Sequence, residues 1–431
     1  MDFVSMLSVM RGINLSDVAY LYGQGLRNKT SHENRVRKWW FTFNALINPL
    51  KFLSYRTRYP QGSKIVFFWK SRNQQDSLQA LVPSLQNYRL NVFQIDASST
   101  GENKLGLSFW HILKFYLLFC CVQISRSNVF SVGSEDRIDI RLVVNSYFYF
   151  YASLVLLKDF KGMVMFANDH STAPRAFFNG TTFLGLPTAY IQHAAVTEVF
   201  PPLTYDYAFL DGKDAVEKYD AIAKARGVVS TTRVYDFGNP KLDKFFQLRK
   251  FRTFKSSIRV GIAISLADRC ELVASLIQKI SQYPTEKIAI RLHPRLKLTS
   301  DQQCVLREAY VDVDIWSGSL FDFLEGIDVL IAGQSSVHLE AVASGVVTYC
   351  YDFGSKHSDY YGFVIQGVAS RLMESTLQDV FCLANLKRNL KSQNDALRHY
   401  LSNDSYESGA ADMIAKKVRD IIQSRSEAVG E

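Results

Sequence analysis

Four clusters of polar residues follow apolar runs of the chain, and their side chains are of the types that bind phosphate or transfer protons. The clusters are Asn168-Asp169-His170, Gln192-His193, Arg291 to Arg295, and Gly333 to Ser336. Histidine and aspartate serve as general bases, whereas hydroxyls, arginines and backbone N–H groups bind anions. The sequence therefore predicts one proton-transfer site and one anion site.

The run from Gly333 to Ser336 ends an apolar stretch and precedes a helical one. Backbone N–H groups at a helix N-terminus, together with the hydroxyls of Ser335 and Ser336, form a site for phosphate. Glu340, a little over one turn into the helix, could reach a ribose diol, and Gly333 would lie near the same ribose and base. The alternative is that one of the two serines is only the N-cap of the helix.

His293 follows the strand-like run that ends at Arg291-Leu292, and Pro294 after it stops the strand. A histidine donates hydrogen bonds to phosphate, and Arg291 and Arg295 add positive charge close by. We therefore expect these three side chains to bind phosphate. A purely structural role for this single histidine is the alternative.

His193 and Asp169 are the two candidates for the general base, because each follows a strand of the same predicted domain. The residues alone leave the choice between them open. Asn168, His170 and Gln192 adjoin the two candidates, and we expect them on the side of the site where an acceptor would bind.

Short apolar runs alternate with helical stretches and would position these clusters. The predicted strands are 64–69, 91–96, 162–167, 187–193, 207–210, 233–237, 259–264, 287–292, 326–332 and 346–351. The predicted helices are 76–85, 107–125, 139–158, 172–184, 268–281, 337–344, 375–391 and 408–425. Strands of this length between helices predict an α/β fold with parallel, doubly wound sheets, in which ligands bind at the carboxyl ends of the strands.

The chain of 431 residues is too long for one core and suits two domains. A basic and aromatic segment (1–60) precedes a Rossmann-like domain (61–240), a linker (241–257) and a second Rossmann-like domain with terminal helices (258–431). We expect the two domains to face each other across a cleft, with the acceptor in the first and the nucleotide in the second.

Composition excludes several classes of protein. The 47% of hydrophobic residues rules out wholesale disorder, and the six cysteines contain no CxxC pair, so neither a zinc site nor a disulfide framework is expected. Asp312-Val313-Asp314 resembles a metal-binding DxD motif but lies in an alternating strand-like run, so no metal is expected there. A Gly-rich dinucleotide motif and a Walker loop are absent from the sequence.

Two segments bear on membranes. Residues 105–124 are strongly apolar, but Lys114 near the middle argues against a spanning helix and favours a buried or interfacial one. Residues 35–58 hold six basic residues and no acidic one around aromatic and leucine side chains. This composition is typical of a segment on an anionic membrane surface. A helix packed on its own domain is the alternative, and no nucleic-acid partner is expected.

The joint pattern of Tyr190 to His193, Gly238-Asn239-Pro240, Arg291 to Pro294, and Gly333 to Ala341 resembles a GT-B glycosyltransferase. More narrowly, it is similar to bacterial surface-polysaccharide enzymes with HP and SS motifs: sialyl- and polysialyltransferases, capsule Kdo transferases and CDP-glycerol glycerophosphotransferases. The resemblance implies that His293, Ser335 and Ser336 bind the donor phosphate. The glycerophosphotransferase branch implies that His193 is the base, although Ala194 replaces the glycine of its HG element, whereas the sialyltransferase branch implies a carboxylate, for which Asp169 is the candidate.

The resemblance implies transfer of a sugar from a CMP- or CDP-linked donor to a capsule, lipopolysaccharide O-antigen or similar acceptor, which could be lipid-linked. It further implies an inverting reaction with no bound cofactor or metal. The N-terminus lacks the basic region of a signal peptide, so we expect a cytoplasmic protein, peripheral on the inner membrane face if residues 35–58 bind lipid. Alternatives are a CDP-alditol phosphate transferase, a non-catalytic nucleotide-binding assembly subunit and a sugar-nucleotide epimerase.

Overall fold

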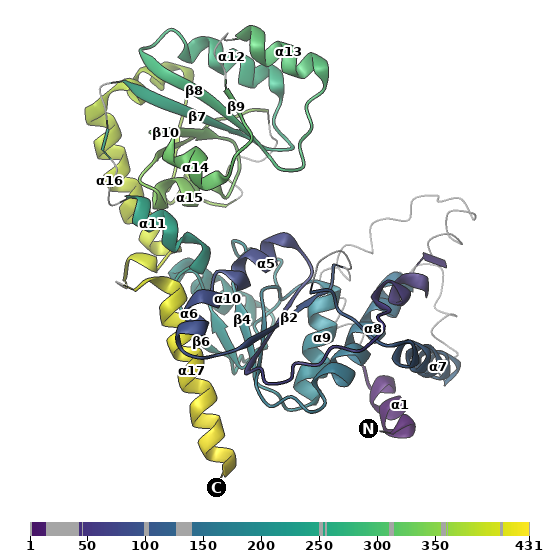
Figure 1. Cartoon of the computed structure of the whole chain (residues 1–431). Coiled ribbons are helices and arrows are strands. Elements are labelled where there is room, and N and C mark those ends of the chain that lie inside the picture. Colours follow the sequence, from purple (N-terminus) through teal and green to yellow (C-terminus); the bar gives the residue numbers. More distant parts are fainter. Residues whose placement is uncertain are drawn as a thin grey trace. The chain divides into compact units, whose positions relative to one another are not determined.

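The computed structural model describes residues 2–13, 43–44, 46–98, 103–125, 140–249, 253–254, 257–309, 314–354, 359, 361–405 and 408–430. The chain forms two compact units (Figure 1). The first unit comprises Met1–Leu210, Ala215–Phe237 and Ala411–Glu431, and the second comprises Asp211–Asp214 and Gly238–Ala410.

Within the described residues, the first unit contains a parallel sheet with strand order β2-β1-β3-β4-β5-β6. Its strands are β1 (Ile65–Trp69), β2 (Val92–Asp96), β3 (Met163–Phe166), β4 (Thr188–Ile191), β5 (Tyr207–Phe209) and β6 (Arg233–Tyr235). Every residue of β1, β3, β4 and β5 is buried. Both faces of the sheet are therefore covered, which explains why these strands are continuous apolar runs.

Alternate residues of these strands belong to two separate cores. Val66, Phe68, Val164 and Phe166 pack with helices α7 (Phe109–Ser125), α8 (Ile140–Leu157) and α9 (Thr172–Phe183). Ile65, Phe67, Met163 and Met165 pack with α6 (Val82–Asn87) and α17 (Gly409–Gly430). The remaining helices described in this unit are α1 (Phe3–Arg11), η2 (Asn48–Phe52), α5 (Arg72–Gln79) and α10 (Lys213–Ala225).

The predicted helix 76–85 is wrong, because two helices, α5 and α6, occupy this part of the chain. Pro83 lies at the start of α6. Proline has no N–H to donate inside a helix but fits the first turn of a new one. The predicted helix 375–391 is likewise divided, into η4 (Glu374–Phe381) and α16 (Leu383–Tyr400).

The second unit also contains a parallel sheet in its described part, with strand order β12-β11-β10-β7-β8-β9. Its strands are β7 (Ile258–Ile264), β8 (Thr285–Leu292), β9 (Asp314–Trp316), β10 (Val329–Ala332), β11 (Val347–Cys350) and β12 (Ser370–Arg371). Its other helices are η3 (Pro240–Leu242), α11 (Asp243–Arg249), α12 (Cys270–Ile280), α13 (Ser300–Ala309), α14 (Leu320–Glu325), α15 (Val337–Ala343) and η5 (Asn403–Ser405). Two Rossmann-like sheets agree with the predicted α/β class.

Helix α17 belongs to the first unit, whereas the sequence assigns 258–431 to the second domain. The apolar residues on one side of α17 lie in the same core as strands β1 and β3; they are Ile414, Ala415, Val418 and Ile421. Burial of this stripe against the first sheet explains the assignment.

Each sheet has a point where the strand order reverses, between β1 and β3 and between β7 and β10. The connections on either side of such a point run in opposite directions, so a crevice forms at the carboxyl ends of the two strands. This edge of each sheet is where ligands of doubly wound proteins bind.

Two predicted features lie partly outside the described residues. Of the basic segment 35–58, the structure describes 43–44 and 46–58, and Asp312 and Val313 of the DxD-like run lie outside the described residues. Asp314 forms an ion pair of 2.8 Å with Lys287. All six cysteines are free.

Candidate functional site

The first cluster of polar residues lies at the carboxyl ends of β3 and β4, beside the reversal point of the first sheet. Asn168, Asp169 and His170 follow β3, and Gln192 and His193 follow β4. The parallel pairing of β3 with β4 brings the two loops together. Each of these residues is buried except His170, which is partly exposed.

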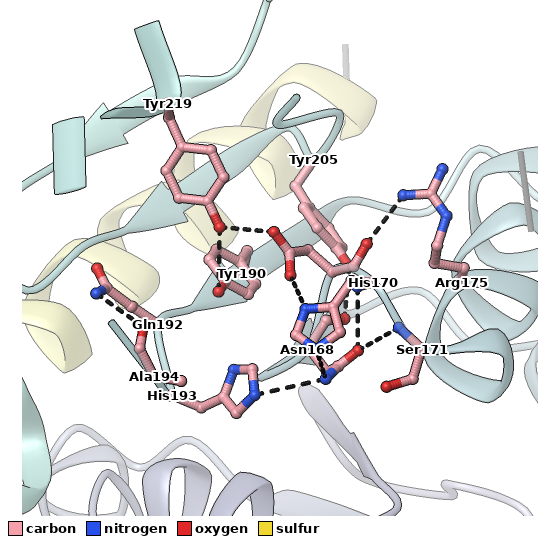
Figure 2. Close-up of polar contacts among 11 residues, drawn as sticks. Asn168, His170, Ser171, Arg175, Tyr190, Gln192, His193, Ala194, Tyr205 and Tyr219 are labelled. Atoms are coloured by element: carbon pink, nitrogen blue, oxygen red, sulfur yellow. Dashed lines mark hydrogen bonds and ion pairs between the residues drawn. The ribbon is translucent and has the colours of Figure 1, made fainter. Parts of the chain in front are cut away.

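The Asn168 side chain links the two histidines (Figure 2). Its Oδ1 accepts hydrogen bonds from the backbone N–H groups of His170 (3.1 Å) and Ser171 (2.7 Å), which fixes the orientation of the amide. Its Nδ2 therefore faces Nε2 of His170 at 3.3 Å and Nε2 of His193 at 3.4 Å. An amide nitrogen only donates, so both Nε2 atoms act as acceptors in this arrangement.

The Asp169 carboxylate accepts two hydrogen bonds from inside the protein. His170 Nδ1 lies 2.8 Å from its Oδ1, and the Tyr219 hydroxyl lies 2.6 Å from its Oδ2. Because a carboxylate accepts, Nδ1 of His170 carries the proton and Nε2 keeps its lone pair. A buried carboxylate in this position orients an imidazole and stabilises it when it becomes protonated.

Two tyrosines enclose the carboxylate and the loop. Burial and the negative charge of Asp169 raise the pKa of Tyr219 well above its ordinary value, so its hydroxyl remains a donor. Burial likewise raises the pKa of Tyr205, whose hydroxyl donates to the carbonyl of Asn168 at 3.0 Å. The hydroxyls of Tyr190 and Tyr219 are 3.3 Å apart.

Further residues hold the two loops in place. Arg175 on α9 donates to the Asp169 carbonyl at 2.9 Å, and Asn73 on α5 donates to the His193 carbonyl at 2.9 Å. The Gln192 side chain donates to the carbonyl of Ala194 at 3.1 Å and so closes its own turn. This bond gives Gln192 a structural role in addition to its predicted place near the acceptor.

The two imidazole rings lie side by side, with centroids 5.7 Å apart and planes 29° from parallel. Phe200 covers the His170 ring, with centroids 4.7 Å apart. Two imidazoles whose Nε2 atoms meet one amide provide two groups able to accept and return protons. Asp169, 1% exposed and bonded at both oxygens, is better suited to orient His170 than to contact substrate.

The second cluster lies at the carboxyl edge of the second sheet. His293 follows β8, and its backbone N–H donates to the carbonyl of Ile264 at the end of β7 (2.9 Å). Its Nδ1 accepts the Arg295 N–H at 3.1 Å, so the ring proton of the neutral imidazole is on Nε2. This Nε2–H is a donor of the kind that phosphate requires. Arg291 donates from Nη1 to the Gly318 carbonyl at 3.0 Å.

The run from Gly333 to Ser336 follows β10, and the buried side chain of His338 holds it in place through a hydrogen bond. The His338 Nε2 donates to the Gly333 carbonyl at 2.9 Å, and its Nδ1 contacts the Thr348 hydroxyl. The Ser335 Oγ accepts the Val337 N–H at the start of α15 at 3.4 Å. The Ser336 side chain is exposed and makes no capping bond. Ser336 therefore holds the N-cap position of α15 without a capping bond, and the hydroxyl of Ser335 before it makes the contact with the helix.

Asp268 lies against Gly333 at the reversal point of the second sheet. A Cβ on Gly333 would come within 2.9 Å of the Asp268 Oδ1. Any residue other than glycine would therefore force the carboxylate to move. The Asp268 Oδ2 accepts the Ser265 N–H at 2.7 Å, and burial raises the pKa of Asp268. Its Oδ1 is buried and accepts no hydrogen bond from the described residues.

Glu340 lies on α15, and burial is the main cause that raises its pKa, while the positive charge of Lys241 opposes the rise. One of its carboxylate oxygens is buried and accepts no hydrogen bond from the part of the chain that the structure describes. Such an oxygen is suited to a ribose hydroxyl, as the sequence predicts, because a ligand donor would satisfy it.

The structure thus brings the side chains of the first cluster into contact with one another, and it places those of the second cluster along the carboxyl edge of the second sheet. His293 follows β8 and Ser335 follows β10, with β7 between them, so the two loops lie roughly 10 Å apart. Sequence reasoning missed Asn73, Tyr219, Asp268 and His338. Asn73 and Asp268 follow strand ends, a signal that could have found them, whereas nothing local marks Tyr219.

No group of three or more histidine, cysteine or acidic side chains among the described residues is arranged to hold a metal ion. No protein-family model matches the chain, and no curated protein sequence matches it.

Solved structures do resemble the chain. A protein described as a UDP-N-acetylglucosamine 2-epimerase from Listeria monocytogenes aligns with a TM-score of 0.53 and 12% identity, over 85% of this chain and 98% of that one. The chain has the GT-B fold. The Neisseria meningitidis UDP-GlcNAc 2-epimerase bound to UDP-GlcNAc aligns with a TM-score of 0.51 and 11% identity, over 82% and 98%. Another UDP-N-acetylglucosamine 2-epimerase aligns with a TM-score of 0.53 and 12% identity, over 83% and 94%. At these identities the likeness shows the fold.

Proposed function

We propose that this GT-B protein is an enzyme that acts on a nucleotide-activated sugar. The observation that carries the proposal is the Asn168 amide, which holds the Nε2 atoms of His170 and His193 beside each other, with a buried carboxylate behind one of them. A protein that only binds nucleotide has no need for such a pair of proton-transfer groups.

We assign the binding of the nucleotide, with its one or two phosphates, to the second unit. The His293 Nε2–H and the Ser336 hydroxyl would donate hydrogen bonds to the phosphate. The Ser335 hydroxyl would donate a third, because its 3.4 Å contact with the Val337 N–H uses only its oxygen as an acceptor. Arg295 adds a positive charge next to His293. These donors would stabilise the charge that develops on a departing phosphate. Arg291 would support the loop, since it is bonded to Gly318.

Sugar recognition and proton transfer are assigned to other residues. Glu340 would accept a hydrogen bond from the ribose through its buried oxygen, with Gly333 beside it. In the first unit, Nε2 of His170 or His193 would take the proton. Asp169 would stabilise the resulting imidazolium at His170, which makes Asp169 a positioning residue.

One candidate reaction is glycosyl transfer. The acceptor hydroxyl loses its proton to an Nε2 as its oxygen forms a bond to the anomeric carbon, and the nucleotide leaves with the electron pair of the broken bond. The HP and SS motifs at His293 and Ser335-Ser336 favour this reaction with a CMP- or CDP-linked donor. The acceptor would be a bacterial surface polysaccharide, and a CDP-alditol would serve the same donor site.

The second candidate is epimerisation of a UDP-linked sugar, and the three structural neighbours favour it. Epimerisation removes a proton from a sugar carbon and later returns a proton to it. His170 and His193 are two neighbouring groups that can accept and return a proton on the side of the sugar that they contact.

Incubation of the purified full chain with UDP-, CMP- and CDP-sugars in deuterated water tests both candidates. Epimerisation predicts deuterium at the sugar carbon with no acceptor present, whereas transfer predicts nucleotide release only when an acceptor glycan is added. Nucleotide binding without deuterium incorporation or acceptor-dependent nucleotide release would contradict both reactions and support a non-catalytic nucleotide-binding subunit. A ligand at 100 times its Kd should stabilise the protein by about 2.7 kcal/mol.

The phosphate assignment has a separate test. The double variant Ser335→Ala/Ser336→Ala and the single variant His293→Ala are each expected to weaken nucleotide affinity at least about tenfold. Ser281→Ala is the matched control, because Ser281 is the C-cap residue of α12, is not part of the proposed phosphate site, and bonds the Gln278 carbonyl. Unchanged affinity in both phosphate-site variants would refute the assignment.

A further inference from the structure

Helix α7 of the first unit is apolar on two faces, and only one of them is buried. Ile112, Phe115, Leu118 and Val122 lie in the core. On the other side, residues at spacings of three or four are 38–77% exposed, which places them in one stripe along the helix. The stripe consists of Trp110, Leu113, Leu117 and Ile124, with Phe109 (57%) at its start and the exposed Cys120 within it.

A neighbouring segment continues this surface. The Tyr116 hydroxyl of α7 donates to the Leu46 carbonyl, and the Thr57 hydroxyl lies 3.0 Å from Nδ1 of His111. Between these two contacts, Leu50 and Leu53 are 48% and 46% exposed. We call the α7 stripe together with Leu46, Leu50 and Leu53 the α7 face. Figure 1 shows α7 beside α1 and α8, at the margin of the first unit.

The two segments that form the α7 face carry only positive charges. Residues 46–58 and 103–125 contain no aspartate or glutamate, and their basic residues are Lys51, Arg56, Arg58, Lys104 and Lys114. Lys51, Arg56 and Arg58 are exposed. An apolar strip bordered by cations matches a surface of lipid tails and anionic headgroups.

Two other occupants fit less well. None of the described helices is long and apolar enough to cross a bilayer, and Lys114 interrupts α7 near its middle. A second copy related by a twofold axis would bring the same set of cations against itself. Like charges across an interface oppose association.

We propose that the α7 face binds the surface of an anionic lipid bilayer. Trp110, Leu117 and Ile124 enter the headgroup region, and the three exposed cations of the neighbouring segment contact lipid phosphates. This inference does not depend on the proposed enzymatic activity, because binding is measured without any nucleotide.

The test is co-sedimentation of the full chain with vesicles of phosphatidylcholine alone or mixed with phosphatidylglycerol. The unmodified protein is expected to sediment with the anionic vesicles and to be released by added salt. Ile124→Ser and Trp110→Ser should each weaken binding about tenfold, because each removes a side chain that enters the lipid. Lys51→Gln and Arg56→Gln should each weaken it on the order of fivefold.

Ile365→Ser is the matched control. Ile365 is in the second unit and is 80% exposed, close to the 77% of Ile124, so its replacement should leave vesicle binding unchanged. Because all four test residues are exposed, thermal unfolding should be unaffected in every variant.

Three results would overturn the proposal. The first is anionic-vesicle binding by Ile124→Ser and Trp110→Ser equal to that of the control, which would assign binding to another part of the chain. The second is equal affinity for neutral and anionic vesicles. The third is a dimer in solution that dissociates on either substitution, which would make the α7 face an interface between copies.

Discussion

His338 should make the stability of the second unit depend on pH. Its ring is 1% exposed and is bonded to the Gly333 carbonyl and the Thr348 hydroxyl. Burial lowers its pKa from 6.5 to about 4. Because unfolding exposes the ring to water, its pKa in the unfolded chain returns to about 6.5.

The direction of this pH dependence follows from how many protons the folded and unfolded chains bind. Between pH 4 and 6.5 the unfolded chain binds a proton at His338 that the folded chain does not bind. The contribution to the free energy of unfolding is therefore fully present above pH 6.5 and is lost as the pH falls toward 4. The difference between the pKa values, 6.5 − 4 = 2.5, corresponds to about 3 kcal/mol.

The variant His338→Gln separates this effect from those of other groups. A glutamine amide can still donate to the Gly333 carbonyl, but it does not titrate. At pH 7 the variant should be less stable by about 1–2 kcal/mol, because the contact with Thr348 is lost. As the pH falls toward 4, the wild-type protein loses the His338 contribution and the variant does not. The stability difference should therefore shrink and reverse.

Hydrogen exchange of the peptides that cover β10 and β11 is the suitable assay, because the two units need not unfold together. Wild type and variant are compared at the same pH. The control His399→Gln removes a histidine of the same unit whose side chain is 31% exposed. A stability difference between wild type and His338→Gln that stays constant from pH 7 to pH 4.5 would refute the reasoning.

Three further predictions concern the first unit. Asp169→Asn should reduce turnover at least about 10²-fold and change its pH profile, because His170 loses the carboxylate that fixes its proton on Nδ1. Tyr219→Phe should lower the free energy of unfolding by about 1–3 kcal/mol, because a buried carboxylate oxygen loses its donor. Gly180→Ala should destabilise by about 1–3 kcal/mol, because the added Cβ would lie 1.8 Å from the Ser153 hydroxyl on the helix packed against α9.

Each of these has a contradicting outcome. Steady-state kinetics that find near-normal turnover in Asp169→Asn would remove the positioning role. Urea unfolding that gives Tyr219→Phe the stability of wild type would mean that the carboxylate is satisfied in another way. Gly185→Ala is the matched comparison for Gly180→Ala, because a Cβ at Gly185 meets nothing within 4 Å although its φ is +69°. A greater loss at Gly185 would make backbone conformation, and not close packing, the dominant cost.

The sequence by itself determined the class of the fold and most of its elements. Met163 to Ala167 is apolar at every residue, and Ala189 to Ile191 is a second such run; continuous apolar runs are typical of strands that are covered on both faces. Both are strands in the structure, as β3 and β4. The polar residues after them could be found because strand ends interrupt the apolar pattern.

The sequence could not determine how these polar residues pair. Asn168 and His193 are 25 residues apart, and Tyr219 is 50 residues from Asp169. Their contacts depend on the strand order, in which β4 lies between β3 and β5, and the apolar pattern of each strand is the same for any order. For this reason the choice between His193 and Asp169 as base stayed open, and the partnership of Asp169 with His170 appeared only in the folded chain.

The same limit applies to helices. The apolar residues of α7 and α17 are readable from the sequence, but the partner of each apolar face is not. Ile414 and Val418 of α17 pack against the first sheet although they follow the whole second unit in the chain. On α7, only the tertiary structure decided that Phe115 is buried and Leu117 is exposed, because hydrophobicity determines which residues favour burial and the fold determines where a partner surface exists.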